Sequence, residues 1–147
     1  MMKSDRNDYF LLLGRILIAA IFLMSGLNKI MAPGQTQAYM ESAGMPFPGL
    51  FLVGAIVLEV GGALSLLLGA YTFWGSLALL IFMIPTTLIF HTNFADPNQM
   101  IHFMKNLAMI GGILYVMEAG PGRISIDAKR RPKSVDRTEA VARRKVA

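Results

Sequence analysis

The sequence predicts an all-α integral membrane protein, a bundle of four membrane-spanning helices with both termini in the cytoplasm. Apolar residues make up 54% of the 147 residues and charged residues only 16%, whereas a soluble domain carries about 25% charged residues. Four stretches reach the roughly 20 largely apolar residues that a membrane span needs. The loops at 32–49, 70–71 and 92–96 contain no Lys or Arg, while both chain ends do. Cytoplasmic segments are the ones enriched in these residues.

The first predicted span covers residues 9–31 and ends before Ala32-Pro33-Gly34. Its apolar stretch is too long for a signal peptide and Arg15 interrupts it, so we expect a helix that the mature protein retains. The outer loop that follows contains the stretch 36–43, which we expect to form a short interfacial helix before the chain turns back into the membrane.

The remaining spans are predicted at residues 50–69, 71–91 and 97–118. The last of them has the clearest start signal. Asp96 can cap the helix, Pro97 suits the first helical position, and Gln99 stands where a capping box places its second residue. Four spans return the chain to its starting side, so this topology agrees with the charge bias.

The predicted domain covers residues 1–127, and residues 128–147 form a basic tail that we expect to be disordered and cytoplasmic. Residues 123–147 hold nine Lys or Arg against three Asp or Glu. A basic tail can bind nucleic acid. Behind four membrane spans, anionic lipid is the expected partner instead, and no nucleic-acid partner is predicted.

The chain contains no cysteine and two histidines. Disulfides, thiolate metal sites and thiol-based redox chemistry are therefore excluded. His91 and His102 could ligate a haem between the third and fourth spans, but without a wider motif we favour interfacial hydrogen bonds. No metal site is predicted, and the sequence shows no cofactor motif.

Ionisable residues inside membrane spans are functional candidates by default. Glu59 lies at the midpoint of its predicted helix, and with a rise of about 1.5 Å per residue Lys105 lies only ~4 Å from the midpoint of its own helix. We therefore predict that Lys105 pairs with Glu59, with Arg15 as the competing partner. The same rise places Arg15 ~7–8 Å inward and Lys29 ~13 Å outward of the midplane.

These residues define a candidate polar pocket. Its predicted members are Glu59, Lys105, Asn106 and Arg15 inside the bundle and Lys29, Asn28 and His91 at its outer mouth. Three candidate cations share one anion, which favours an anionic or carbonyl-bearing ligand. The alternative interpretation is an ion pair that fixes helix register, with Lys29 and Arg15 extending their charges to the membrane surfaces.

Several stretches, taken in order and at their spacing, resemble the DoxX family of small bacterial four-helix membrane proteins. The match runs from about Leu13 to Asp127 and includes Leu13-Gly-Arg15-Ile-Leu, Ser25-Gly-Leu-Asn28-Lys29-Ile, Leu58-Glu59-Val-Gly-Gly, His102-Phe-Met-Lys105-Asn106-Leu-Ala-Met-Ile-Gly-Gly and Gly120-Pro-Gly-Arg-Ile-Ser-Ile-Asp127. The basic tail is longer than the family leads us to expect.

The resemblance implies a multi-pass protein of the inner (plasma) membrane, and a membrane subunit or small enzyme of quinone-linked redox metabolism. Sulfur-compound oxidation and oxidative-stress defence are the settings that it suggests. Quinone is then the candidate small molecule, with a redox partner protein and a homo-oligomer as candidate partners beside the lipid bilayer. Two alternatives stay open: a non-enzymatic scaffold or assembly subunit, and a carrier of a small anion or lipid. No catalytic residue is assigned, and whether the chain is an enzyme is left undecided.

Overall fold

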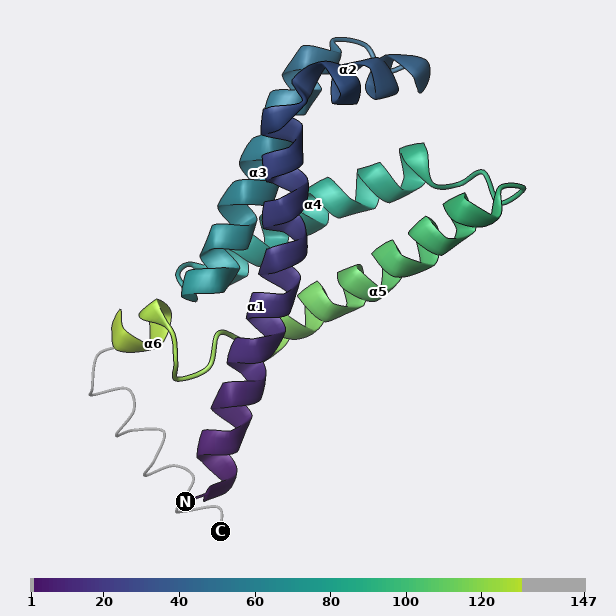
Figure 1. Cartoon of the computed structure of the whole chain (residues 1–147). Coiled ribbons are helices and arrows are strands. Elements are labelled where there is room, and N and C mark those ends of the chain that lie inside the picture. Colours follow the sequence, from purple (N-terminus) through teal and green to yellow (C-terminus); the bar gives the residue numbers. More distant parts are fainter. Residues whose placement is uncertain (1, 131–147) are drawn as a thin grey trace.

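The computed structural model describes residues 2–130, which form six helices and no strand. They are α1 (Met2–Met31), α2 (Pro33–Ser42), α3 (Pro48–Leu68), α4 (Thr72–Phe90), α5 (Pro97–Ala119) and α6 (Ile126–Arg130) (Figure 1). Four of them, within α1, α3, α4 and α5, are long and apolar enough to cross a membrane. The all-α class and the four predicted spans are confirmed.

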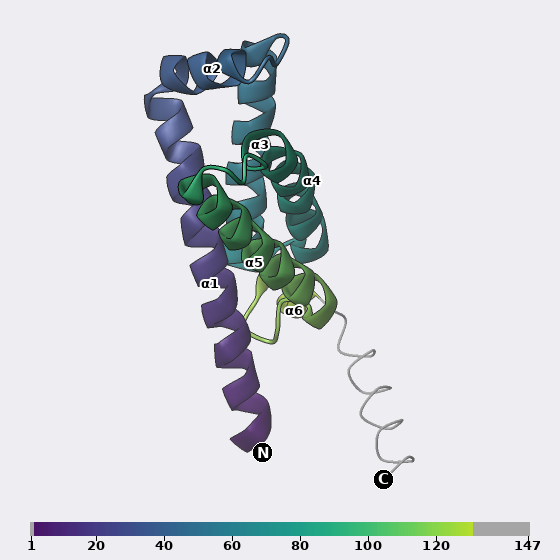
Figure 2. The same ribbon diagram turned by 90° about the vertical axis from the view of Figure 1, so that its right-hand side faces the viewer.

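The four long helices run antiparallel in chain order, and α2 lies across one end of the bundle (Figures 1 and 2). Helix α1 packs chiefly on α3, α3 also on α4, and α4 on α5. The opposite end brings the start of α1 next to the end of α5, because the Asp8 carboxylate accepts a hydrogen bond of 2.9 Å from the backbone N–H of Arg123. We call this the inner end, and the end with α2 the outer end.

The predicted helix boundaries need small corrections. Helix α1 begins at Met2 instead of residue 9, because residues 2–8 contain no Gly or Pro to stop it. Helix α3 begins at Pro48, which suits the first helical position, and ends at Leu68 because Gly69 takes a left-handed conformation with φ of 62°. The short helix predicted within the outer loop is α2.

The start of α5 confirms one capping prediction and corrects another. The Asp96 side chain accepts a hydrogen bond of 2.8 Å from the backbone N–H of Asn98, and Pro97 opens the helix. Gln99 does not complete a capping box. Its Oε1 atom lies 2.7 Å from Nδ1 of His91, so it joins α5 to the end of α4 instead.

The segment after α5 folds back under the inner end of the bundle. Asp127 accepts hydrogen bonds from the backbone N–H groups of Tyr71 and Thr72 at 2.8 and 2.9 Å and from the Thr72 hydroxyl at 3.0 Å. It therefore caps the start of α4 from 55 residues away in sequence. Residues 128–130, assigned to the tail from sequence, belong to α6. The rest of the predicted tail lies outside the described residues.

Nine buried apolar side chains, contributed by all four spans, form the core in the middle and inner part of the bundle. They are Ala19, Phe22, Ala63, Leu66, Leu79, Leu80, Met83, Ile113 and Val116. The polar residues of the outer half therefore lie on the other side of an apolar layer from Arg15 and Asp127.

Candidate functional site

Glu59 on α3 forms an ion pair with Lys29 on α1. The Lys29 Nζ atom lies 2.9 Å from Oε2 and 3.2 Å from Oε1 of the carboxylate. The Glu59 side chain is only 1% exposed. The prediction that Glu59 pairs with Lys105, or else with Arg15, is wrong. Its partner is Lys29, the remaining candidate cation.

The register of α1 against α3 explains the error. Gly26 packs directly on α3, where a Cβ atom would meet Val60 Cγ2 and lie 3.7 Å from Glu59 Cβ. The last quarter of α1 is thus level with the middle of α3, whereas the sequence estimate placed both helix midpoints at one depth. Helical side chains tilt toward the N-terminus, so Lys29 reaches back by a turn to the level of Glu59.

The Lys29 ammonium is held from several sides but is not fully enclosed. It donates a hydrogen bond of 2.8 Å to the Ser25 hydroxyl, one turn earlier on α1, and lies 5.6 Å from the centre of the Phe82 ring on α4. Its side chain is 17% exposed, against 1% for Glu59. A molecule approaching this pair would therefore meet Lys29 first.

Thr87 on α4 and Asn106 on α5 form a second buried polar contact. The Asn106 Nδ2 group donates to the Thr87 hydroxyl at 3.1 Å, and that hydroxyl donates in turn to the Met83 carbonyl at 2.7 Å. Both side chains are buried, so each has the partner that burial requires. Asn106 thus faces the bundle interior as predicted, although its partner is Thr87.

A third cluster joins the outer ends of α4 and α5. The His91 and His102 rings stack with centroids 5.1 Å apart and planes 25° apart. Because the rings lie face to face, their Nε2 atoms do not oppose one another across a haem plane. His91 contacts Gln99, and the Lys105 Nζ atom lies 3.1 Å from His102 Nδ1. Lys105 and His102 are exposed, so Lys105 lies outside the buried pair.

Arg15 and Asn28 do not join the outer polar residues. Arg15 is 1% exposed and donates to the Leu66 carbonyl at 3.0 Å and the Ile124 carbonyl at 2.6 Å. Carbonyl groups at the end of a helix attract a cation, so Arg15 fastens the middle of α1 to the inner end of α3 and to the segment after α5. Asn28 is exposed on the side of α1 away from α3.

Comparison with known proteins now identifies the family. The DoxX family model matches residues 10–92, more than half of the chain. The chain belongs to the DoxX family. The match ends at the His91 turn, so α5 and its Asn106 and Lys105 lie beyond it.

Three relatives of this DoxX protein match a larger share of the chain than the family model does. The inner membrane protein YqjF of Escherichia coli K12 is 41% identical over 121 residues, covering 82% of this chain and 92% of YqjF. The inner membrane protein YphA of the same organism is 35% identical over 124 residues, covering 81% and 89%. The uncharacterized membrane protein Rv3486 of Mycobacterium tuberculosis H37Rv is 28% identical over 126 residues, covering 78% and 77%. No solved structure matches the chain.

Two of these relatives are named inner membrane proteins, and with the four apolar helices this confirms the predicted inner-membrane location. Ser25, Phe82 and Thr87 also line these polar contacts, although they were not among the predicted site residues. Ser25 stands four residues before Lys29, a spacing that brings helical side chains together, so it could have been found. In the sequence, Phe82 looks like an ordinary apolar residue and Thr87 like part of a helix kink. Only the packing of α4 shows that they contact the polar residues of the site.

Proposed function

We propose that this DoxX protein is a quinone-binding membrane subunit or small enzyme of redox metabolism, with the quinone headgroup bound at the Lys29–Glu59 pair. Sulfur-compound oxidation or oxidative-stress defence is the setting that the family resemblance suggests. The observation that carries the proposal is the asymmetry of the pair: the carboxylate is buried, and its ammonium partner keeps an accessible side.

The chemistry of the two side chains suits a quinone and its reduced form. Lysine has three N–H donors, of which Ser25 and Glu59 take two, and the third can donate to a quinone carbonyl. The carboxylate buried behind this ammonium can take up and release a proton. Both groups lie on packed helices, which fixes their positions better than a loop would.

Quinone reduction to quinol takes two electrons and two protons. Glu59 is a single proton-holding site, so the protons pass through it one after the other. The chain has no cysteine thiol to supply the electrons. In the proposed settings the electrons come either from a redox partner protein or from a reduced sulfur compound, which is oxidised by two electrons as the quinone is reduced. In the first case the protein is a quinone-binding subunit, and in the second a small enzyme.

The test is to purify the full chain in mild detergent, extract it and identify bound small molecules by mass spectrometry. The informative variant is Lys29→Met/Glu59→Gln, which removes both charges together and leaves no unpaired buried ion. Its matched control is Lys129→Met/Glu41→Gln, which makes the same chemical changes at exposed positions on α6 and α2.

We expect quinone in near-stoichiometric amount in the wild type and the control, and none in the Lys29→Met/Glu59→Gln variant. Thermal melting of each sample shows whether it is folded. Only ordinary phospholipid in all three folded samples would contradict the proposal. The scaffold function would then be favoured, with the ion pair serving to hold α1 against α3.

A further inference from the structure

Two cations at the inner end, Lys129 and Arg130, lie on a short helix that contacts from elsewhere in the fold hold in place. Helix α6 has five residues, too few to be stable in isolation. The backbone N–H of Asp127 donates a hydrogen bond of 2.8 Å to the Gly69 carbonyl, and the Asp127 carboxylate caps α4. These contacts attach α6 to the turn between α3 and α4, so its two cations are held beside that turn.

The turn that holds α6 lies at the membrane surface. Helices α3 and α4 have 21 and 19 residues, or about 30 Å each at 1.5 Å per residue, close to the thickness of the hydrocarbon core. Residues 69–71 join them and therefore lie where the hydrocarbon ends. Tyr71 and Trp74 are 64% and 65% exposed, and these two residue types are enriched at membrane interfaces. Helix α6 is thus level with the lipid headgroups.

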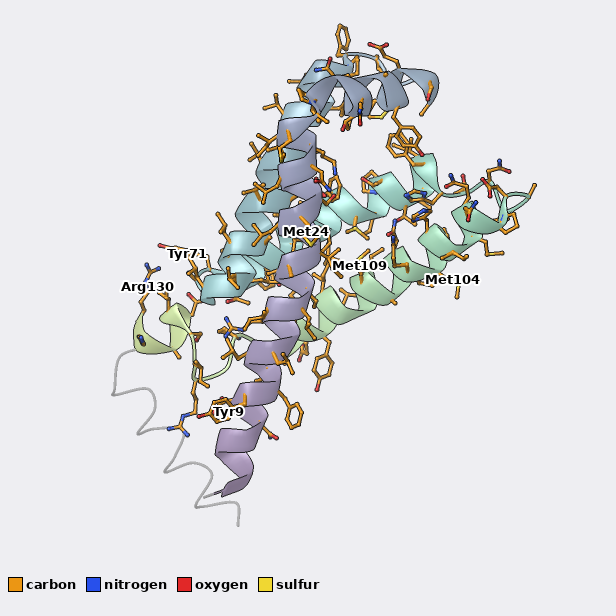
Figure 3. All side chains as sticks on the ribbon, in the orientation of Figure 1. Tyr9, Met24, Tyr71, Met104, Met109 and Arg130 are labelled. Atoms are coloured by element: carbon orange, nitrogen blue, oxygen red, sulfur yellow. The ribbon has the colours of Figure 1, made fainter. Side chains whose placement is uncertain are left out.

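Arg130 is oriented by the Tyr71 ring. Its guanidinium carbon lies 5.0 Å from the centre of the ring, and Figure 3 shows the two labelled side chains next to one another at the edge of the molecule. A ring face attracts a cation and holds it in position. The guanidinium still has N–H donors for a phosphate group, which arginine can bind through two parallel hydrogen bonds.

The charges around α6 favour an anionic ligand. Lys129 and Arg130 are both exposed. The carboxylate on the same helix, Asp127, already accepts hydrogen bonds on both oxygens, from the backbone of Tyr71 on one and from Thr72 on the other. Asp127 is therefore committed to the cap, and the two cations outnumber it.

From these contacts we infer that α6 binds an anionic phospholipid, with Lys129 and Arg130 on the phosphate of its headgroup. The acyl chains would lie along the aromatic surface that begins at Tyr71. That surface continues into Phe73 and Trp74, whose rings pack edge to face with centroids 5.4 Å apart and are both more than half exposed. A soluble phosphate could use the two cations but not this surface, so a lipid is the better ligand.

This site differs from the attraction of lipid to the basic tail that the sequence predicts. That attraction needs only net charge, whereas the site at α6 needs two particular cations at a fixed place. It also does not depend on the quinone proposal. A lipid bound here would join α6 to the start of α4, which is the contact that Asp127 also makes.

The experiment is to titrate the full chain in mild detergent with phosphatidylglycerol and, separately, with phosphatidylcholine of the same acyl chains. Native mass spectrometry counts the bound lipids. The informative variant is Lys129→Gln/Arg130→Gln. Its matched control is Arg144→Gln/Lys145→Gln, which removes the same two charges from the tail beyond the described residues.

We expect the wild type and the control to bind phosphatidylglycerol more tightly than phosphatidylcholine. The α6 variant should bind phosphatidylglycerol about tenfold more weakly or worse, from the loss of charged hydrogen bonds. Because Lys129 and Arg130 are exposed, this variant should remain folded, which thermal melting checks.

Three results would overturn the inference. Equal binding of the two lipids by the wild type would show that the headgroup charge is not recognised. Equal weakening in the α6 variant and the tail control would show that net charge alone attracts the lipid. Displacement of phosphatidylglycerol by excess inorganic phosphate would make a soluble phosphate the ligand. Failure to find quinone in the protein would leave this inference standing.

Discussion

At the scale of single residues, the Lys29–Glu59 pair decides how strongly a substitution in this region destabilises the fold. An isolated carboxylate buried in an apolar medium is so costly that it takes up a proton instead. Lys29 supplies the opposite charge, and the Ser25 hydroxyl and the Phe82 ring complete the surroundings of the ammonium. Arg15 is equally buried, yet its partners are neutral carbonyl groups at the inner end. Two buried charges in one bundle are thus stabilised in different ways.

A double-mutant cycle should show the coupling of the pair. We expect Lys29→Met to lower the free energy of unfolding by about 3–5 kcal/mol, because it leaves Glu59 buried without its partner. Glu59→Gln should lower the free energy of unfolding by less, since the Lys29 side chain is partly exposed and its ammonium can reach the surface. The double variant Lys29→Met/Glu59→Gln should recover most of the loss. The measurement is unfolding in mild detergent, and strictly additive losses would show that the two residues do not depend on one another.

At the scale of helices, glycines decide how closely α3 and α4 approach. Gly62 and Gly75 face each other, and a Cβ atom on Gly62 would lie 2.9 Å from the Gly75 carbonyl oxygen and within 2.8 Å of the Leu79 side chain. Gly61, the next residue on α3, has nothing within 4 Å of such a Cβ atom. Small residues at contacts of this kind let membrane helices pack backbone against backbone.

These neighbouring glycines provide a matched test. Gly62→Ala should destabilise the fold by about 1–3 kcal/mol, because the methyl group has no space between α3 and α4. Gly61→Ala should be neutral or stabilising by up to about 1 kcal/mol, because alanine has the higher helix propensity and faces open space. Thermal melting of both variants checks the prediction, and similar losses in the two would refute the close contact.

The cap on α4 should make the stability of the inner end depend on pH. Desolvation alone would raise the pKa of Asp127, but the hydrogen bonds from Thr72 and Tyr71 and the charge of Arg130 together lower it below its ordinary 3.8. A carboxyl group with a lowered pKa stabilises the fold above the ordinary value, and that stabilisation is lost as the pH falls through the folded-state pKa.

Asp127→Ala should therefore cost about 1–2 kcal/mol at neutral pH, the usual loss for a helix cap. The difference from the wild type should shrink as the pH falls below 3.8. Melting temperatures of both proteins between neutral and acid pH measure this. A difference that stays constant across the range would mean that the Asp127 charge contributes nothing.

At the scale of the whole molecule, the number and order of the membrane spans could be predicted from the sequence. The partners of side chains on different helices could not. Span number and approximate boundaries follow from length and hydropathy, which are local properties. The partner of Glu59 depends on how far α1 slides along α3, and that register is set by the packing of Gly26 on Val60. The residue that caps α4 is Asp127, which follows α5 in the sequence. No residue near Thr72 in the sequence indicates that the cap comes from there.

The side of the membrane on which the ends lie is the last prediction. The Asp8–Arg123 contact places the start of α1 and the segment after α5 at one end of the bundle, and the Lys and Arg bias predicts that this end is cytoplasmic. Because the chain has no native cysteine, single cysteines introduced by Ser42→Cys on α2 and Lys129→Cys on α6 report each end without background. A membrane-impermeant maleimide applied to spheroplasts should label Ser42→Cys at once and Lys129→Cys only after the membrane is permeabilised. The reverse pattern would invert the topology, and α2 would then lie on the cytoplasmic side of the membrane.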